Sequence, residues 1–257
     1  MRTSQTHPSG ALSGAAERQM RNWAFDLQTR QRLAEEREKM QLKDLIYPYL
    51  VMSRETGSDA ESLAQAIAAQ CGWKMLDREL LDYMAEHEHF SRLALDFVDE
   101  RTVSWFHEVF GKWLDKGLVS QAEYVSRMGK LVLLAAQHES TIFVGRGIQF
   151  MLPRQLGLRV RIIAPLKQRI ATIMAKRQCG EREAKSFIET TDHERAQFVQ
   201  RYFHRDVADP DLYDLIVNLA HIPREDAVDV IATAAMRHRD RVRSDTLKRA
   251  TASAMPA

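Results

Sequence analysis

The stretch YLVMSRETGSDAES, residues 49–62, decides the fold. Residues 49–53 are a short apolar run of the kind that parallel sheets bury. A small polar loop with Gly57 follows, and apolar residues then recur at helical spacing as far as Gly72. A strand–loop–helix junction directs backbone N–H groups and the positive end of the helix at one spot, which suits a phosphate. We therefore expect an anion-binding loop here.

The alternation of strand and helix continues along the chain. Apolar runs typical of buried strands recur at 141–145, 158–164 and 214–218. Helical patterns occupy 78–138, 165–202 and 224–238. This order predicts an α/β domain with a parallel sheet, flanked by helices and joined by right-handed crossovers.

The ends of the chain differ in composition from this domain. We expect a disordered lead-in at 1–14, a helical arm at 15–46, the main domain at 47–240 and a flexible tail at 241–257. In the arm, Met20, Trp23 and Leu27 fall at helical spacing. Two interpretations stand: a mostly solvated helix laid against the domain, or an arm that forms a homodimer or binds a protein partner.

Composition excludes several classes of protein. The chain has 257 residues, 45% of them hydrophobic, and a net charge of +2, which gives no argument for nucleic-acid binding. Its two cysteines, Cys71 and Cys179, argue against a disulfide scaffold or a structural zinc site. No apolar run approaches a membrane span, and no apolar leader segment follows Met1, so we expect a cytoplasmic protein.

The loop at 53–62 differs from a complete phosphate loop, or P-loop. Gly57 supplies the turn, Ser58 follows it, and Ser62 stands where a hydroxyl would bind Mg²⁺. Ala60 occupies the lysine position and Asp59 that of a second glycine. A carboxylate beside a triphosphate costs about 1–4 kcal/mol at close range unless a metal or a cation intervenes.

Several collinear stretches resemble the cytidylate kinase-like family. They are 49–68, GWKMLDRELL at 72–81, FVGRG at 143–147, IAPL at 163–166, TDHERA at 191–196 and DPDLYDLIVN at 209–218. Together they span about 47–236. The resemblance implies a P-loop kinase-like parallel sheet with a helical acceptor-binding insertion at about 78–138 and a helical lid at about 166–205.

The same resemblance implies a role for Arg54. In this family the loop lysine is often absent and a serine–arginine pair precedes the loop, as Ser53 and Arg54 do here. Arg54 is then a displaced cation for the phosphates. The alternative is an arginine at a strand end that pairs with Glu55 or Glu79.

Arg146 stands between two glycines after a buried strand. In true CMP kinases a similar arginine, followed by aspartate, grips the acceptor phosphate, but Gly147 replaces that aspartate here. A surface arginine is the alternative interpretation.

Four further residues are candidates for nucleotide binding. Asp77 and Arg78 follow a short predicted strand, where the acceptor lies in nucleoside monophosphate kinases, although Asp77 also suits a helix N-cap. Asp192 and Arg195 resemble the DxxR of the kinase lid, and equally suit a surface ion pair.

The resemblance therefore implies phosphoryl transfer from ATP, with Mg²⁺, to a small acceptor, a nucleoside monophosphate such as CMP. Arg54, Arg146 and Arg195 would act on phosphates. The alternative is a non-catalytic nucleotide-sensing module, favoured by Asp59 and Ala60, that signals through its helical arm.

Overall fold

The computed structural model describes residues 9–34, 46–76, 78–87 and 119–254. The chain divides into two compact units, which consist of residues 1–46 with 77–138 and of residues 47–76 with 139–257.

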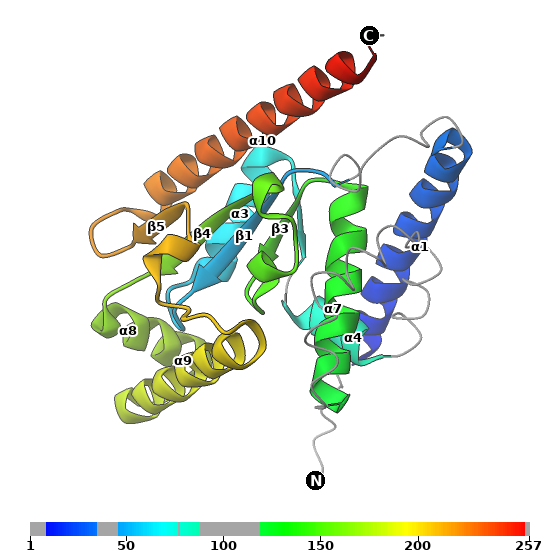
Figure 1. Cartoon of the computed structure of the whole chain (residues 1–257). Coiled ribbons are helices and arrows are strands. Elements are labelled where there is room, and N and C mark those ends of the chain that lie inside the picture. Colours follow the sequence, from blue (N-terminus) through cyan, green and yellow to red (C-terminus); the bar gives the residue numbers. More distant parts are fainter. Residues whose placement is uncertain (1–8, 35–45, 77, 88–118, 255–257) are drawn as a thin grey trace. The chain divides into compact units, whose positions relative to one another are not determined.

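The larger unit is built on a parallel sheet of five strands among the described residues (Figure 1). The strands are β1 (Tyr49–Arg54), β2 (Lys74–Leu76), β3 (Thr141–Val144), β4 (Gly157–Ile163) and β5 (Leu215–Asn218). Their order is β2-β3-β1-β4-β5, and every pairing is parallel. All carboxyl ends therefore lie at one edge, with β1 in the middle. The parallel α/β sheet expected from the sequence is confirmed.

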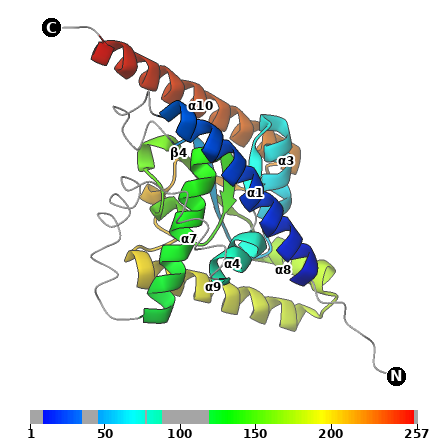
Figure 2. The same cartoon turned by 90° about the vertical axis from the view of Figure 1, so that its right-hand side faces the viewer.

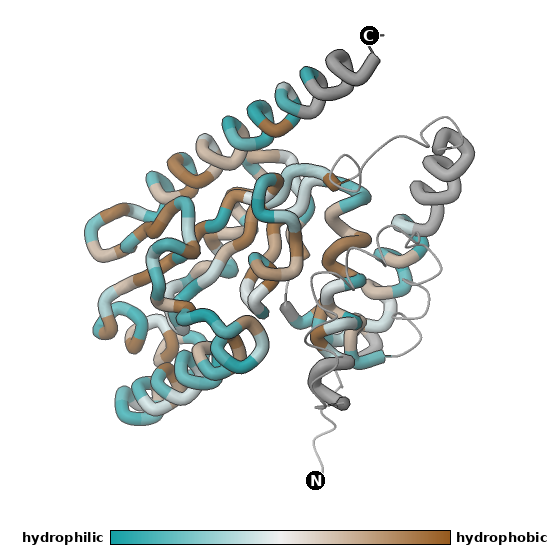
Figure 3. Tube along the Cα trace, in the orientation of Figure 1, coloured by the Kyte–Doolittle hydropathy of each residue, from teal (hydrophilic) through white to brown (hydrophobic). Residues whose placement is uncertain are grey.

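Two helices, α3 (Ala60–Cys71) and α10 (Arg224–Ala254), pack on one face of this sheet. Alternate residues of the central strands, such as Leu50, Met52 and Val160, are buried against them in one hydrophobic core. Hydrophobic segments of the trace follow the strands, whereas much of α9 (Glu181–Phe203) is hydrophilic (Figure 3). Because successive side chains of a strand point to opposite faces of the sheet, these alternate residues share the face that the two helices cover.

The expected lid is a pair of helices. α8 (Leu166–Arg177) and α9 pack together through a small core of Ile170, Ile173, Ala184 and Ile188. The sequence predicted one helical region here, but Gln178 adopts φ +52° and ends α8. Short 3-10 turns, η1 (Ile148–Phe150), η2 (Arg154–Leu156) and η3 (Pro210–Leu212), complete this unit.

The smaller unit consists of helices in its described part: α1 (Ser9–Ala34), α4 (Arg78–Glu86) and α7 (Val119–His138). Each of the three contacts the other two, and they lie side by side in Figure 2. The Tyr124 hydroxyl of α7 donates to Asp82 of α4 at 2.5 Å. The helical arm and the helical insertion expected from the sequence therefore belong to one unit, while residues 88–118 of the insertion lie outside the described residues.

Two boundaries differ from those expected. α1 begins at Ser9, within the predicted lead-in 1–14, because its alanines and Leu12 favour a helix despite Gly10 and Gly14. α10 continues to Ala254, through most of the predicted flexible tail, since no glycine or proline interrupts 224–254. None of the helices in the described ranges combines the length and apolar character that crossing a membrane requires.

Candidate functional site

The loop between β1 and α3 is a tight turn at the carboxyl edge of the sheet. The N–H and Oγ of Ser58 both donate to the carbonyl of Glu55, at 3.3 and 2.8 Å. Gly57 has φ +83° and Asp59 φ +58°, so two left-handed residues turn the chain before α3 begins at Ala60. This conformation suits glycine and is tolerated by aspartate. The predicted strand–loop–helix junction, called the phosphate loop from here on (residues 54–60), is present.

Gly57 brings the phosphate loop against α8. A Cβ at this position would lie 2.6 Å from the carbonyl oxygen of Arg169, closer than a non-bonded contact allows. Its positive φ disfavours other residues as well. Glycine is therefore required both for the turn and for the close approach of α8.

Asp192 on α9 ties the phosphate loop to the α8–α9 pair. One of its carboxylate oxygens accepts the Thr56 N–H at 2.8 Å and the Thr56 hydroxyl at 2.6 Å. The other accepts Arg169 Nη1 at 2.7 Å. Arg195 Nη1 lies 3.7 Å from the same carboxylate, so the predicted Asp192–Arg195 pair is present but is only part of a larger network.

Arg54 is buried at the end of β1, its side chain only 5% exposed. Its Nε and Nη2 contact Glu61 Oε1 at 2.9 and 2.8 Å, so its partner is Glu61, in the first turn of α3, rather than Glu55 or Glu79. A Cβ on Gly145 would lie 1.9 Å from Arg54 Nη1, so that glycine makes room for the guanidinium.

The charge of Glu61 is stabilised by its surroundings. Burial raises the pKa of this carboxyl, but the Arg54 charge and hydrogen bonds from Arg54 and the backbone outweigh it, so the net pKa lies below the ordinary 4.5. The charge of Arg195 acts in the same direction. Arg54, Glu61 and Arg195 thus form one electrostatic group at the carboxyl edge.

Arg146 follows β3 at the same edge. It adopts φ +56° between two glycines that also have positive φ. Its guanidinium carbon lies 5.8 Å from the centre of the Phe198 ring, which α9 carries one turn after Arg195. A Cβ on Gly147 would lie 2.3 Å from the Phe203 ring, so glycine there lets the loop after β3 approach α9. The structure therefore brings three predicted arginines, Arg54, Arg146 and Arg195, to one edge of the sheet.

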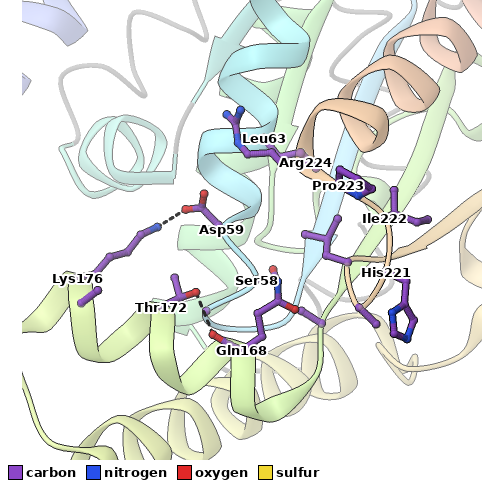
Figure 4. Close-up of a pocket in the computed structure, with 15 residues that line it drawn as sticks. Ser58, Asp59, Leu63, Gln168, Thr172, Lys176, His221, Ile222, Pro223 and Arg224 are labelled. Atoms are coloured by element: carbon purple, nitrogen blue, oxygen red, sulfur yellow. Dashed lines mark hydrogen bonds and ion pairs between the residues drawn. The ribbon is translucent and has the colours of Figure 1, made fainter.

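A cavity of about 670 Å³ opens beside the phosphate loop (Figure 4). The loop contributes Gly57, Ser58 and Asp59 to its lining, and α8 contributes Gln168, Thr172, Ala175 and Lys176. The segment 219–224 after β5 lines the other side. In Figure 4 Lys176 reaches from α8 toward Asp59, and its Nζ lies 2.5 Å from the Asp59 carboxylate.

Ser62 lies near a cation. Arg224 Nη2 donates to both the carbonyl and the hydroxyl oxygen of Ser62, at 2.9 Å each. A guanidinium on this hydroxyl does not suit a Mg²⁺ ligand, since the two positive charges repel each other. No group of three or more His, Cys, Asp or Glu side chains that could hold a metal occurs in the described part of the chain. Ser62 as a metal ligand stays a prediction.

The other two predicted residues are placed only in part. Asp77 lies outside the described residues, and Arg78 is the first residue of α4, in the smaller unit. Their roles stay predictions.

A family model described as the cytidylate kinase-like family matches residues 50–221, a stretch that runs from β1 through β5. The chain belongs to the cytidylate kinase-like family. Membership of the cytidylate kinase-like family supports a nucleotide-dependent, kinase-type function. None of the curated proteins compared with this chain matches it.

This cytidylate kinase-like protein is similar to several solved structures. An uncharacterised protein from Eubacterium ventriosum is 18% identical, with a TM-score of 0.60, and the match covers 74% of this chain and 98% of that one. Shikimate kinase from Bacteroides thetaiotaomicron is 17% identical with a TM-score of 0.42, over 73% and 97% of the two chains. The first of these similarities shows that the uncharacterised protein has the same fold.

Sequence reasoning did not single out several residues of this site. Thr56, Glu61, Arg169, Lys176 and Arg224 contact the predicted residues, yet none belongs to a recognisable spacing with them. The one feature of the sequence that could have indicated such a contact is the negative charge of Glu61, seven residues after Arg54.

Proposed function

We propose that this protein transfers the γ-phosphoryl group of ATP to a small acceptor, a nucleoside monophosphate such as CMP. The observation that carries the proposal is the cavity of about 670 Å³ beside the phosphate loop, with arginines of β1, of the loop after β3 and of α9 at the same sheet edge. Phosphoryl transfer depends mainly on positioning and on cations around the moving group.

The cavity suits the donor nucleotide. Its volume falls within the range of small-molecule sites, and Leu63, Ala175, Leu219 and Ile222 offer apolar surface for a base. Gly57 and Ser58 form the end of the cavity at the start of α3, where N–H groups favour phosphate oxygens.

The arginines suit the transferred group and the acceptor phosphate. Arg54 is held in place by Glu61, in the space that Gly145 leaves, so little conformational entropy is lost when it binds a phosphate. Arg195 belongs to α9 and Arg146 packs against the Phe198 ring of that helix, so movement of α9 would shift Arg195 and change the contact that Arg146 makes. Closure of the α8–α9 pair would exclude water from the phosphates.

The Ser62 hydroxyl does not suit a protein-bound Mg²⁺, because Arg224 donates a hydrogen bond to it. A magnesium ion bound by phosphates of ATP would neutralise charge that develops during transfer.

Calorimetric titration with Mg-ATP, Mg-GTP, CMP, UMP, AMP and dCMP tests the proposal, followed by coupled-assay turnover with each binder. We expect a triphosphate and a monophosphate to bind, and Arg146→Ala to lower turnover by about 100-fold or more. Arg237→Ala, an exposed arginine of α10, is the matched control and should leave turnover unchanged. Absence of binding by any nucleotide would overturn the proposal.

A non-catalytic nucleotide-sensing module is the second candidate. It is favoured by Ala60 at the lysine position and by the Asp192 carboxylate, which already occupies the Thr56 N–H of the phosphate loop. Binding of a nucleotide without turnover for any acceptor would support this candidate over the kinase.

A further inference from the structure

The first turn of α3 lacks the cation of a complete P-loop, because Ala60 occupies that position. Among the described residues that line the cavity, Lys176 and Arg224 carry full positive charges. Arg224 is bonded to the carbonyl and hydroxyl oxygens of Ser62. Lys176 instead points at the phosphate loop itself, and its Nζ lies 2.5 Å from Asp59 Oδ1 (Figure 4).

Stability alone gives little reason for this ion pair. The side chains of Lys176 and Asp59 are 52% and 37% exposed, and ion pairs at such exposure contribute little to folding. Asp59 also adopts φ +58°, a conformation that glycine takes without strain. The residue thus places a carboxylate in an anion-binding loop at some backbone cost, and Lys176 neutralises it.

We propose that Lys176 supplies the cation that the phosphate loop lacks, and that Asp59 holds it beside the loop before the nucleotide arrives. The inference rests on the proposed function, since it concerns the triphosphate of a nucleotide in the cavity. An ammonium group has three donors, so Nζ can keep Asp59 and still bind a phosphate oxygen. A lysine on α8 thereby takes the place of the lysine that a complete P-loop has at the start of the following helix.

This arrangement also makes nucleotide binding depend on α8. A lysine within the phosphate loop would move with α3, whereas Lys176 belongs to the helix pair that packs on the other side of the cavity. Polyphosphate bound between Lys176 and the loop would hold α8 against α3. Nucleosides without phosphates would gain nothing from this contact.

The test compares the affinities of ATP, GTP, adenosine and guanosine for matched variants of the full chain by calorimetry. Lys176→Met removes the charge and keeps the aliphatic stem, while Lys176→Arg restores a cation. Lys167→Met is the control, because Lys167 is exposed and nine residues away on α8, on the opposite side of the helix.

We expect Lys176→Met to weaken triphosphate binding by about 30-fold and nucleoside binding by less than about twofold. Lys176→Arg should recover most of the loss, and Lys167→Met should bind like the parent. Asp59→Gly suits the left-handed backbone at this position. In a protein that carries this change, Lys176→Met should weaken triphosphate binding by only about fivefold, because no uncompensated carboxylate then faces the phosphates.

Two outcomes overturn this inference alone: triphosphate binding by Lys176→Met equal to that of Lys167→Met, or equal loss of triphosphate and nucleoside. The first means that the lysine does not contact phosphate, and the second that it only shapes the cavity. If the parent protein binds none of the four compounds, the proposed function fails and the inference fails with it.

Discussion

The carboxylate of Asp192 on α9 accepts the backbone N–H of Thr56 in the phosphate loop at 2.8 Å, across 136 residues of sequence. Its two oxygens also bind the Thr56 hydroxyl and Arg169. Loop N–H groups of this kind are the donors that phosphates use. A residue of α9 thus holds the loop and Arg169 in place.

Replacing Asp192 by alanine should lower the free energy of unfolding by about 1–3 kcal/mol, because Arg169 and the Thr56 N–H lose a charged acceptor. Urea denaturation at neutral pH measures the effect. Glu194→Ala, an exposed change two residues further on α9, should shift stability by less than about 0.5 kcal/mol. Equal stability of the two variants would show that the Asp192 network adds nothing to folding.

Gly145→Ala should be more damaging than an alanine at another left-handed glycine. The new Cβ would lie 1.9 Å from Arg54 Nη1, in addition to the strain of φ +84°. Gly72→Ala carries the same kind of strain at φ +66° but meets nothing within 4 Å. Denaturant unfolding should show a loss of about 1 kcal/mol for Gly72→Ala and of about 2–4 kcal/mol for Gly145→Ala. Similar losses would mean that Arg54 moves aside without cost.

Glu61→Gln should destabilise the protein in a pH-dependent way. The folded pKa of Glu61 is lowered, so its contribution is present above the ordinary value of 4.5 and is lost as the pH falls below that value. We expect the free energy of unfolding of the parent to exceed that of the variant by about 0.5–1 kcal/mol at neutral pH, because Arg54 is buried and keeps a weaker partner while solvent screens the half-exposed Glu61.

The difference between parent and Glu61→Gln should shrink as the pH is lowered from about 5 to 3 in parallel denaturation series. Glu189→Gln, in an exposed i, i+4 pair with Lys185, is the control and should show little effect at any of these values. A difference in free energy of unfolding between parent and variant that stays constant with pH would contradict the ion pair of Glu61 with Arg54.

Filling the cavity should prevent nucleotide binding. Ala175 is an exposed residue of α8 that lines the cavity, so Ala175→Trp should weaken ATP binding by at least about tenfold while stability stays nearly constant. Ala175→Ser leaves the space open and should bind like the parent. Calorimetry measures the ATP affinity of both variants, and thermal unfolding measures their stability. Undiminished binding by Ala175→Trp would place the nucleotide elsewhere.

Local sequence patterns predicted much of the fold. Apolar runs predicted β1, β3, β4 and β5 to within a residue or two, because burial between layers imposes continuous apolar sequence on parallel strands. The helix after the loop was predicted from its apolar period and from Gly72, which ends it with φ +66°. The break between α8 and α9 was not predicted, since glutamine at position 178 does not indicate a left-handed residue in the sequence.

The candidate site was predictable only for residues that belong to motifs. Arg54, Arg146 and Arg195 were expected at phosphates, and all three lie at the carboxyl edge of the larger unit, although their roles stay predictions. The sequence offered Glu55 and Glu79 as partners for Arg54, while the structure pairs it with Glu61. Partner choice depends on side-chain direction at a strand end, which residue spacing does not specify.

By itself, the sequence determined the order of strands and helices, the phosphate loop and the absence of its lysine, because these depend on neighbours within a few residues. Only the tertiary structure decided which charges meet there. Lys176 reaches Asp59 across 117 residues and Asp192 reaches Thr56 across 136. Such contacts depend on how α8 and α9 pack against the sheet edge, and packing brings together side chains that no local periodicity relates.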